Sequence, residues 1–576
     1  MKSLVSTGTL LMVSAAVVAG PSGSPPERPA PLWNWSGFYA GVHGGGGRTD
    51  INIGKMPGRA IFGDRVEMPL FLFGGQLGYN FHFRERWLLG LEADAAWAWS
   101  EGMGTCGAFD GDFVSFNCRA DTDSVATIAG RAGYSLGSGG RTLVYAKAGA
   151  ARISGDLEIY STNQRDPKGS THSGLSRWGW TVGAGIEQAL TPNWSLKFEY
   201  NYLDFDDKSF TTPPSAFVDQ GPDPDQPDQS QVQLRDAPPL KAEARQKQHL
   251  FKVGLNYHFG DASRRARPSG PERESGWEVA GGVRYLRSSI KTQYDYQGQG
   301  RGDLVSRLTF DHMHLNAGEL FARVDSPWNL FVKGYVGLGH MDSGRQNDED
   351  WAANDNDFGY SNTISRAQGN SRYATADIGY NFLRSPEYRA GLFAGYSYYD
   401  LEVDATGCEQ IGSSEGGCTP DDDFAVPGRL IIHRPDRWKG IRLGADGQVA
   451  LNDCLTLGGE FAYLTRVHFD GRDHHLLRQT TTYFYERANK GEGVQLEARL
   501  SYRFSEAFSA SLGARYQALW SRGGHQRAVA FTPAKELKPG DGADLPGEFV
   551  IDDPTGERHR MESLGVFLEA SYAFGH

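Results

Sequence analysis

Apolar and polar side chains alternate along much of the chain, in runs of about ten residues that are rich in aromatic side chains. Successive side chains of an extended backbone point to opposite faces, so each run predicts a β-strand with one apolar face. The first half of the chain contains about eight such runs. They lie at residues 35–42, 75–83, 87–94, 128–134, 143–150, 178–187, 194–202 and 249–259.

The connections between these runs alternate in length. Turns of a few residues alternate with long polar loops at residues 49–68, 101–122, 155–176 and 206–247. Short periplasmic turns and long external loops are typical of an outer-membrane β-barrel, and a soluble β-sandwich has no reason to keep this alternation. The pattern therefore predicts a transmembrane barrel of about eight strands over residues 24–260. Within the last loop, a run of Pro, Asp and Gln between Pro213 and Leu240 predicts disorder.

The second half repeats this rhythm with about ten runs. They lie at residues 277–290, 304–324, 329–341, 371–382, 387–402, 436–450, 455–470, 491–504, 508–523 and 561–574. Long polar loops are expected at residues 342–370, 403–435, 471–490 and 524–560.

The charged residues 261–275 between the halves predict a flexible linker. This linker is expected to be periplasmic, because an even number of strands returns the chain to the side where it entered. The predicted fold class is therefore all-β, with two tandem transmembrane antiparallel β-barrels over residues 24–260 and 276–576.

The N-terminus has the order of a secretory signal peptide. Lys2 precedes an apolar run that begins near Leu10 and ends in small residues near Gly20. This run is too short to span a bilayer. Residues 1–23 are therefore predicted to be a signal peptide, and the rest of the chain is predicted to lie in the bacterial outer membrane.

Cysteine spacing and net charge narrow the choices that remain. Cys106 and Cys118 share one polar loop and Cys408 and Cys418 share another, so the sequence predicts two local disulfides in an oxidising compartment. Cys454 is left over. Neither pair has companion His or Cys residues at the spacing of zinc ligands, which makes metal binding the weaker interpretation. The net charge of −12 argues against nucleic acid as a partner.

Candidate chemistry lies in two polar stretches of the second half. Asp473 and His475 share one face of an extended backbone, so the aspartate can orient the imidazole. Asp348 and Asp350 have the same spacing upstream. Counted from the periplasm, the third predicted strand ends outside just before Asp348 and the seventh ends outside at Asp470, so both stretches are expected at the external rim. The alternatives are solvated loop charges and a divalent metal site built from the same four side chains.

The first half contains four motifs of glycine and aromatic residues. They are Trp35-Ser36-Gly37-Phe38-Tyr39-Ala40-Gly41, Gly74-Gly75-Gln76-Leu77-Gly78-Tyr79-Asn80, Arg131-Ala132-Gly133-Tyr134 and Trp178-Gly179-Trp180-Thr181-Val182-Gly183-Ala184-Gly185-Ile186-Glu187. On these motifs, residues 31–260 resemble the small porin-like outer-membrane immunogenic proteins of alphaproteobacteria. Because a barrel of about eight strands is filled by its own side chains, we expect this half to have an anchoring or structural role.

The second half carries a different set of motifs. They are Val305-Ser306-Arg307-Leu308, Gly337-Leu338-Gly339, Asp348-Glu349-Asp350-Trp351, Ala390-Gly391-Leu392-Phe393-Ala394-Gly395-Tyr396, Leu457-Gly458-Gly459-Glu460-Phe461 and Asp473-His474-His475. On these motifs, residues 276–576 resemble the omptins, a family of outer-membrane aspartic-type endopeptidases.

The omptin resemblance implies that Asp473 and His475 form the pair that activates a water. It also implies that Asp348 and Asp350 are facing carboxylates that help to place this water and the scissile carbonyl. The chemistry is coherent, because a histidine can accept a proton at neutral pH and crowded carboxylates can share one. An acidic mouth would also attract basic peptide segments. The resemblance implies no cofactor, but it implies lipopolysaccharide as a partner on which activity depends.

Two positions depart from the omptin pattern. Gly471 stands where the family prefers an acidic residue, and Gln293 lies near the place of another specificity acid. Both departures affect the family's preference for cleaving between basic residues rather than the hydrolytic machinery.

The leading hypothesis is an external endopeptidase barrel tethered to a structural barrel. One alternative is a non-catalytic pair of barrels that serves as adhesin, receptor or envelope structure. The other is a diffusion porin, against which a filled barrel interior argues.

Overall fold

The computed structural model describes most of the chain. The described residues are 32–54, 65–108, 115–137, 139–161, 170–213, 215–222, 230–237, 239–260, 276–297, 304–351, 360–413, 418, 426–476, 481–531 and 549–574. Within these ranges every regular element is a β-strand, and no helix there is long and apolar enough to cross a membrane. The predicted signal peptide and linker, residues 1–23 and 261–275, lie outside the described residues.

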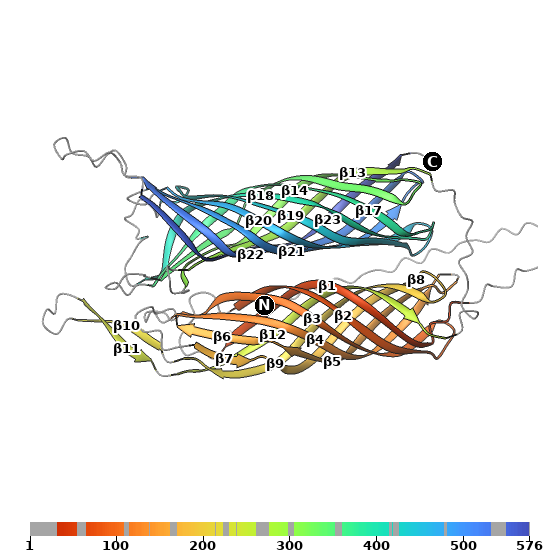
Figure 1. Ribbon diagram of the computed structural model, residues 1–576, viewed down its shortest axis with the longest axis horizontal. Coiled ribbons are helices and arrows are strands. Elements are labelled where there is room, and N and C mark those ends of the chain that lie inside the picture. Colours follow the sequence, from red (N-terminus) through yellow and green to blue (C-terminus); the bar gives the residue numbers. More distant parts are fainter. Residues whose placement is uncertain are drawn as a thin grey trace, which may run out of the picture.

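The first barrel is a closed antiparallel sheet (Figure 1). In the described residues, eight of the ten strands in this sheet form the ring. They are β1 (Gly37–Gly54), β2 (Arg65–His82), β3 (Trp87–Ala108), β4 (Ser115–Leu136), β5 (Thr142–Ser154), β8 (Arg177–Ala189), β9 (Trp194–Thr211) and β12 (Lys241–His258). Pairing of β1 with β12 and of β3 with β4 closes the ring. The other two strands, β6 (Asp156–Ser161) and β7 (Ser170–Gly174), extend it at one end.

The strands of this barrel run further than the sequence pattern predicts. β3 and β4 take up most of the loop that was expected at residues 101–122. The predicted disorder between Pro213 and Leu240 is wrong for the described residues, because β10 (Ser215–Pro222) and β11 (Ser230–Ala237) pair as an antiparallel hairpin. The prolines of this segment flank these strands or end them, where a missing N–H does not interrupt the ladder.

The second barrel is also closed, through pairing of β13 with both β14 and β23. Among the described residues, ten of the eleven strands in this sheet form the ring. They are β13 (Glu278–Gln297), β14 (Leu304–Asp325), β15 (Leu330–Met341), β17 (Tyr360–Arg384), β18 (Tyr388–Ser413), β19 (Leu430–Ala450), β20 (Leu455–His475), β21 (Thr481–Arg503), β22 (Phe508–Phe531) and β23 (Phe549–Phe574). The predicted fold class, all-β with two tandem antiparallel barrels, is confirmed.

The remaining strand, β16 (Arg345–Trp351), continues the course of β15. It pairs with β14 on one side and β17 on the other, which are also the two neighbours of β15. The loop predicted at residues 342–370 is therefore largely strand. This correction matters, because Asp348 and Asp350 lie on a ladder-bonded strand instead of a loop.

Both predicted disulfides are present. Cys106–Cys118 joins β3 to β4, and Cys408–Cys418 lies at the external end of β18. Cys454 has a free, exposed thiol in the turn between β19 and β20. Oxidised cysteine pairs agree with a location outside the cytoplasm.

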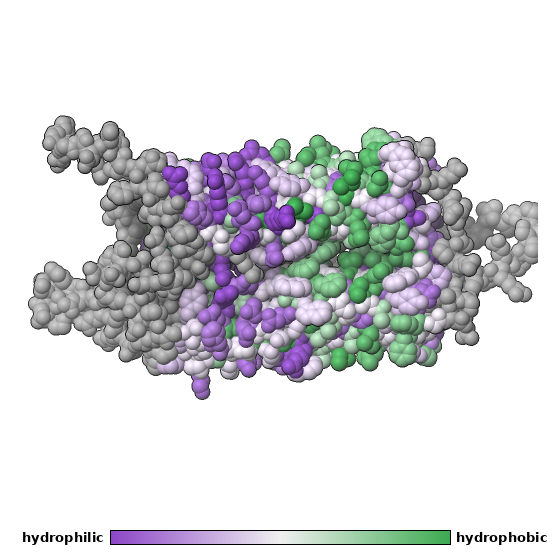
Figure 2. Space-filling view, in the orientation of Figure 1, coloured by the Kyte–Doolittle hydropathy of each residue, from purple (hydrophilic) through white to green (hydrophobic). Residues whose placement is uncertain are grey.

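The outer surface of each barrel is apolar along one part of its length and polar along the rest, as β13 illustrates. Its odd positions point outward and its even positions inward along the whole strand. Near its start, Val283 is exposed outside and Arg284 is buried inside, whereas nearer its end Gln293 lies outside and Tyr294 inside. The apolar part of the outer surface is a belt suited to the hydrocarbon of a bilayer, and the polar part lies beyond it (Figure 2).

Exposed apolar side chains make up this belt on both barrels. In the first barrel they include Phe38, Leu77, Leu91, Trp97, Ile128 and Trp180. In the second barrel they include Leu320, Val336, Leu338, Ile378, Leu392 and Leu568. The short turns of both barrels lie at the same end of the molecule, so the two barrels have the same orientation (Figure 1).

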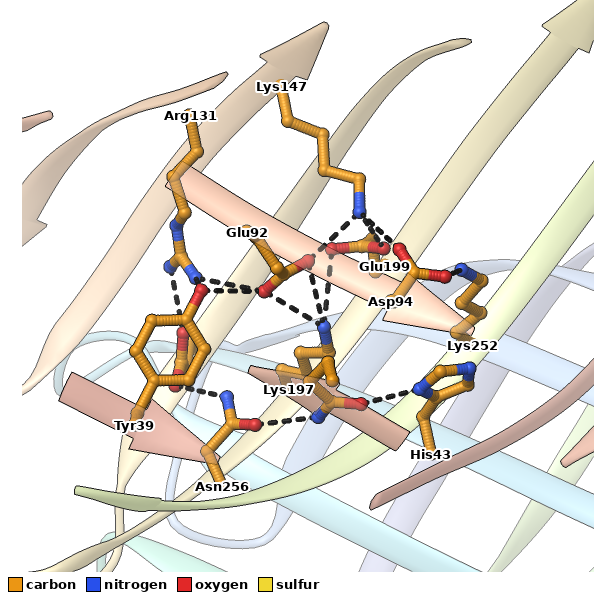
Figure 3. Close-up of polar contacts among 12 residues, drawn as sticks. Tyr39, His43, Glu92, Asp94, Arg131, Lys147, Lys197, Glu199, Lys252 and Asn256 are labelled. Carbon is orange, nitrogen blue, oxygen red and sulfur yellow. Dashed lines mark hydrogen bonds and ion pairs between the residues drawn. The ribbon is translucent and has the colours of Figure 1, made fainter. Parts of the chain in front are cut away.

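Opposite charges fill one part of the lumen of the first barrel (Figure 3), and buried apolar clusters fill other parts. The buried members of this network are Glu92, Asp94, Glu187, Glu199, Arg131, Lys147, Lys197 and Lys252. Lys147 Nζ lies 3.0 Å from a carboxylate oxygen of Glu92 and 2.8 Å from one of Glu199. Acids and bases are equal in number here, so each buried charge has an opposite charge beside it, as burial of ions requires. The network leaves the lumen filled, in keeping with the small size of the barrel.

The lumen of the second barrel is layered. Near the short turns, Arg284 bridges Glu319 at 3.2 Å and Glu569 at 2.6 Å. Above this ionic layer lies a buried apolar layer. Its members include Leu286, Ile290, Leu308, Phe310, Met313, Leu315, Leu401, Val403, Val467 and Phe469. Buried charged side chains, such as Arg434 and Glu486, lie above the apolar layer at the external end.

The two barrels pack against each other side by side. The ring of Phe71 on β2 stacks on that of Phe461 on β20, with centroids 5.8 Å apart. Val494 is buried on the outer face of β21, and Leu496 is nearly so. Both side chains pack on the glycine-rich β1, with atoms 3.6 Å from where a Cβ of Gly46 would stand. The barrels are thus joined by direct contact as well as by the covalent chain.

The charge network of the first barrel generates a stability prediction. Glu92→Gln keeps the shape of the side chain but removes one negative charge from between Lys147 and Lys197. Leaving a buried cation uncompensated costs about 3–5 kcal/mol, so the free energy of unfolding in urea should fall by that order. Arg487→Ala is the control, because Arg487 pairs with Asp470 where both side chains are exposed, and it should leave unfolding nearly unchanged. Equal stability of Glu92→Gln and the wild type would contradict the assigned role of the network.

Candidate active site

Asp473 and His475 lie in contact at the external end of β20. Asp473 is 3% exposed, and the His475 side chain is partly buried. Nε2–H of His475 donates to Oδ2 of Asp473 at 3.0 Å. The ring of Phe484, on β21, packs edge to face against the imidazole with centroids 5.4 Å apart. The structure therefore brings this pair together on one face of the strand, as their alternation predicts.

Asp348 and Asp350 face the same lumen from β16. In the antiparallel ladder, Asp348 stands directly opposite Leu308 of β14, and Asp350 stands opposite Ser306. Residues directly opposite share a face of the sheet, and Leu308 belongs to the apolar layer of the lumen. Both aspartates are half-buried. Since β17, β18 and β19 separate β16 from β20 in the ring, the two aspartates lie on a different wall from Asp473 and His475.

A buried charged floor lies beneath the Asp473–His475 pair. Arg434 on β19 has Nη1 at 3.5 Å from Oδ2 of Asp473 and Nη2 at 2.5 Å from Oε2 of Glu486 on β21. His559 on β23 has Nε2 at 3.2 Å from the same Glu486 oxygen, and its ring stacks on Phe469 at 4.0 Å between centroids. The floor connects four strands below the candidate site.

Sequence reasoning missed Arg434 and Glu486. It assigned both residues to long external loops, at residues 403–435 and 471–490, whereas β19 begins at Leu430 and β21 at Thr481. Alternation was the one available signal, because Ile432, Arg434 and Asp436 share a parity.

Burial and charge act in opposite directions on the carboxylates of this region. The outward residues of β20 at this height, such as Asp470 and Arg472, are polar, so the region lies beyond the apolar belt. Burial alone would raise the pKa of Asp473, but His475 and Arg434 more than offset burial, so its pKa is lowered. Burial raises the pKa of Asp436, on β19, to about 7 against the attraction of Arg434. Asp473 is therefore the anion best suited to orient an imidazole and stabilise its charged form.

The two departures from the omptin pattern differ in position. Gln293 lies on the outer face of β13, where its Nε2 donates to the backbone oxygen of Met103 in the first barrel at 3.0 Å. The expectation that Gln293 stands near a specificity position is therefore wrong. Gly471 does face the lumen, and a Cβ there would lie 2.7 Å from Oδ1 of Asp436 and 2.5 Å from the ring of Phe469. The space beside Gly471 is thus already taken.

The alternative metal site is not assembled. Among the described residues, the group of His, Cys, Asp and Glu side chains close enough together to share one ion is Asp121, Asp123 and Asp156, in the first barrel. Asp348, Asp350, Asp473 and His475 do not form such a group. His474, next to the pair, points away from the lumen and packs its ring 4.4 Å from that of Tyr483.

Two protein families match successive parts of the chain. The family described as outer membrane protein beta-barrel domain matches residues 9–235. The family described as Protochlamydia outer membrane protein matches residues 281–542.

Individual proteins are similar to the chain as well. The 31 kDa outer-membrane immunogenic protein of Brucella melitensis is 28% identical over 261 residues, which cover 44% of this chain and 94% of that protein. The outer membrane protease OmpP of Escherichia coli is 26% identical over 221 residues, which cover 36% of this chain and 69% of OmpP. The structure of the outer membrane protease OmpT from Escherichia coli covers 52% of this chain and 97% of OmpT, with 17% identity and a TM-score of 0.43.

The closed, belted barrels and these sequence relatives define a bacterial outer-membrane β-barrel protein. The N-terminal part of the chain is an outer-membrane β-barrel domain related to the Brucella immunogenic proteins, and an omptin protease is among the sequence neighbours of the chain.

The lowered pKa of Asp473 generates a pH prediction. A carboxylate whose pKa is lowered by folding contributes stability above its unfolded pKa, about 4, and this contribution is lost as the pH falls through the folded value. Asp473→Asn should therefore unfold at lower urea than the wild type at pH 7, and the difference should shrink as the pH falls below about 4. Asp470→Asn, on the exposed outer face of the same strand, is the control and should unfold at nearly the same urea concentration as the wild type at pH 7. A difference for Asp473→Asn that is independent of pH would contradict the assignment.

Proposed function

We propose that the second barrel, within residues 276–576, is an omptin-type endopeptidase that hydrolyses peptide bonds at its external rim. One observation carries the proposal: the Asp473–His475 contact shares its lumen and its end of the barrel with Asp348 and Asp350. The sequence similarity to the protease OmpP supports it.

The geometry of the pair suggests which atoms act. Nε2 of His475 is engaged with Asp473, so Nδ1 is the nitrogen that takes a proton from the attacking water. The water oxygen then bonds to the scissile carbonyl carbon, and Asp473 stabilises the imidazolium that forms. The same proton passes to the leaving amine when the carbon–nitrogen bond breaks. No side-chain nucleophile takes part.

The carboxylates complete this site. Asp348 and Asp350, on the facing wall, accept hydrogen bonds from the water and help to place it against the scissile carbonyl. Oδ1 of Asp473 is buried and has no hydrogen-bond partner among the described residues.

The substrates are proposed to be peptide or protein segments that enter from outside. Asp436 occupies the space beside Gly471, but it accepts a hydrogen bond from Tyr294 and pairs with Arg434. This wall of the site thus offers no isolated anion, and we expect a weaker preference for basic residues than an acid at position 471 would give. Lipopolysaccharide is proposed as the outer-membrane partner that supports activity, on the omptin resemblance.

The catalytic assignment can be tested by peptide hydrolysis. Refolded full-length protein with lipopolysaccharide is offered a library of quenched fluorescent peptides. His475→Ala and Asp473→Asn should each lower kcat/KM by about 100-fold or more, because general acid–base groups contribute factors of that size. Asp348→Asn and Asp350→Asn should also lose activity.

His474→Ala is the matched control for these variants. It lies on the same strand one residue away, but on the opposite face, so it should retain wild-type turnover. Equal turnover in the wild type and in His475→Ala would remove the proposal. Loss of activity in His474→Ala equal to that in His475→Ala would show that the strand, and not the pair, is what the variants disturb.

The filled lumens favour an anchoring role for the first barrel over a porin. In planar lipid bilayers the full chain should give no stepwise conductance, because the charge network of the first lumen and the apolar layer of the second lie across the path of ions. Regular conductance steps in purified protein would favour the porin alternative.

A further inference from the structure

The outer face of β16 is in contact with the first barrel. Glu349 lies between Asp348 and Asp350 in the sequence, so its side chain points away from the lumen. It is only 1% exposed, because the first barrel covers it. Oγ1 of Thr105, on β3, lies 3.0 Å from each carboxylate oxygen of Glu349 and donates to that carboxylate. β16, which carries the two aspartates, is thus bound to the first barrel through its outer face.

Arg307 of β14 extends this contact. It stands directly opposite Glu349 in the ladder, and its Nη1 donates to Oγ1 of Thr105 at 2.9 Å. Its Nη2 donates to Oδ1 of Asn117, on β4, at 3.0 Å, and its Nε donates to Asp295 at 2.6 Å. All five side chains are at most 5% exposed. The Thr105 hydroxyl therefore accepts from a buried cation and donates to a buried anion.

The part of the first barrel that makes this contact is firmly built. Thr105 and Asn117 are directly opposite each other in the β3–β4 ladder. The adjacent residues Cys106 and Cys118 point inward, into the apolar interior of the first barrel, and form a disulfide. A covalent bond thus ties β3 to β4 beside the two side chains that reach the second barrel.

β16, the strand that Thr105 contacts, is held less regularly by its own sheet. β16 has seven residues and is separated from β15 by a break at residues 342–344. Its neighbour β17 pairs with β18 through register shifts between Asn362 and Thr363 and between Ile364 and Arg366, which are the residues opposite β16. Irregular pairing of this kind locally disrupts the ladder. A contact to the outer face of β16 therefore adds support where the second barrel supplies less of its own.

We propose that the disulfide-bonded end of the β3–β4 hairpin positions β16, with Thr105 and Asn117 as positioning residues for Asp348 and Asp350. The inference rests on the proposed function for its catalytic consequence. The first barrel is then more than an anchor, since it fixes one wall of the site on its neighbour. Small displacements of a catalytic group are costly, with about 1 Å sufficient for a large loss of rate.

The test compares two substitutions at one position. Thr105→Val keeps the branched shape but removes the donor to Glu349 and the acceptor for Arg307. Thr105→Ser keeps the hydroxyl. We expect Thr105→Val to lower kcat by about tenfold, as for a misplaced catalytic group, with KM changed less than kcat, and Thr105→Ser to restore kcat. If Thr105 had only a structural role, Thr105→Val would lose activity only in proportion to the fraction of unfolded protein.

Hydrogen–deuterium exchange gives a readout that does not depend on catalysis. Amides of residues 345–351 should exchange faster in Thr105→Val than in Thr105→Ser or the wild type, because the local opening free energy of β16 falls. Glu387→Ala is the control for barrel packing in general, since Glu387 pairs with Arg141 at the opposite end of the barrels, at 2.9 Å. It should leave exchange at β16 and kcat unchanged. If Thr105→Val does not refold, Asn117→Ala replaces it. This substitution removes the acceptor for Arg307 and also the donor to the Tyr160 hydroxyl within the first barrel.

The outcomes separate the two proposals. Unchanged exchange at β16 in the folded Thr105→Val or Asn117→Ala protein would overturn the positioning role, whatever the activity. Faster exchange together with wild-type kcat would also overturn it, because β16 would then need no positioning for turnover. A third outcome is faster exchange at β16 in Thr105→Val when the wild-type protein itself cleaves no peptide. It would contradict the proposed function but would still establish that the first barrel supports β16.

Discussion

The structure depends on closure of each sheet. In a bilayer no water satisfies backbone N–H and C=O groups, so a strand can cross only where both of its edges are paired. The β3–β4 pairing closes the first ring, and the β13–β14 pairing closes the second. Closure also fixes the side of every residue, because successive side chains alternate between lumen and exterior. The lumens, the belt and the candidate site all follow from that alternation.

A closed barrel of this size must fill its own interior, and both barrels do so with paired charges and buried apolar side chains. The first combines balanced charges, such as Lys147 between Glu92 and Glu199, with buried apolar clusters. The second places an apolar layer between an ionic layer and the external polar site. This layer isolates Asp473 and Arg434 from the ions below, so burial at the external end is set by local packing. Asp473 can then be buried and still remain anionic, because His475 and Arg434 compensate it.

The two barrels are in direct contact, so the first barrel can act on the structure of the second. Aromatic stacking at Phe71 and Phe461 and the close approach at Gly46 join the barrels within the belt. Beyond the belt the contact becomes polar, and Thr105 reaches the strand that carries Asp348 and Asp350. A linker alone would only raise the local concentration of one barrel near the other. The buried hydrogen bonds at Glu349 and Arg307 instead make the first barrel part of the wall of the second.

The sequence by itself determined the strands of the belt, the strict alternation of short turns and long connections, both disulfides and the shared face of Asp473 and His475. Each of these follows from local periodicity or spacing. Beyond the belt both faces of a strand change chemistry, as Val283 and Gln293 show on the outside of β13, so the pattern ends before the strand does. For that reason β16, Arg434 and Glu486 were hidden in predicted loops and Gln293 was placed near the site. Only the tertiary structure decided which wall faces which and that Thr105 meets Glu349, because residues so far apart in the sequence are brought together by barrel closure and packing.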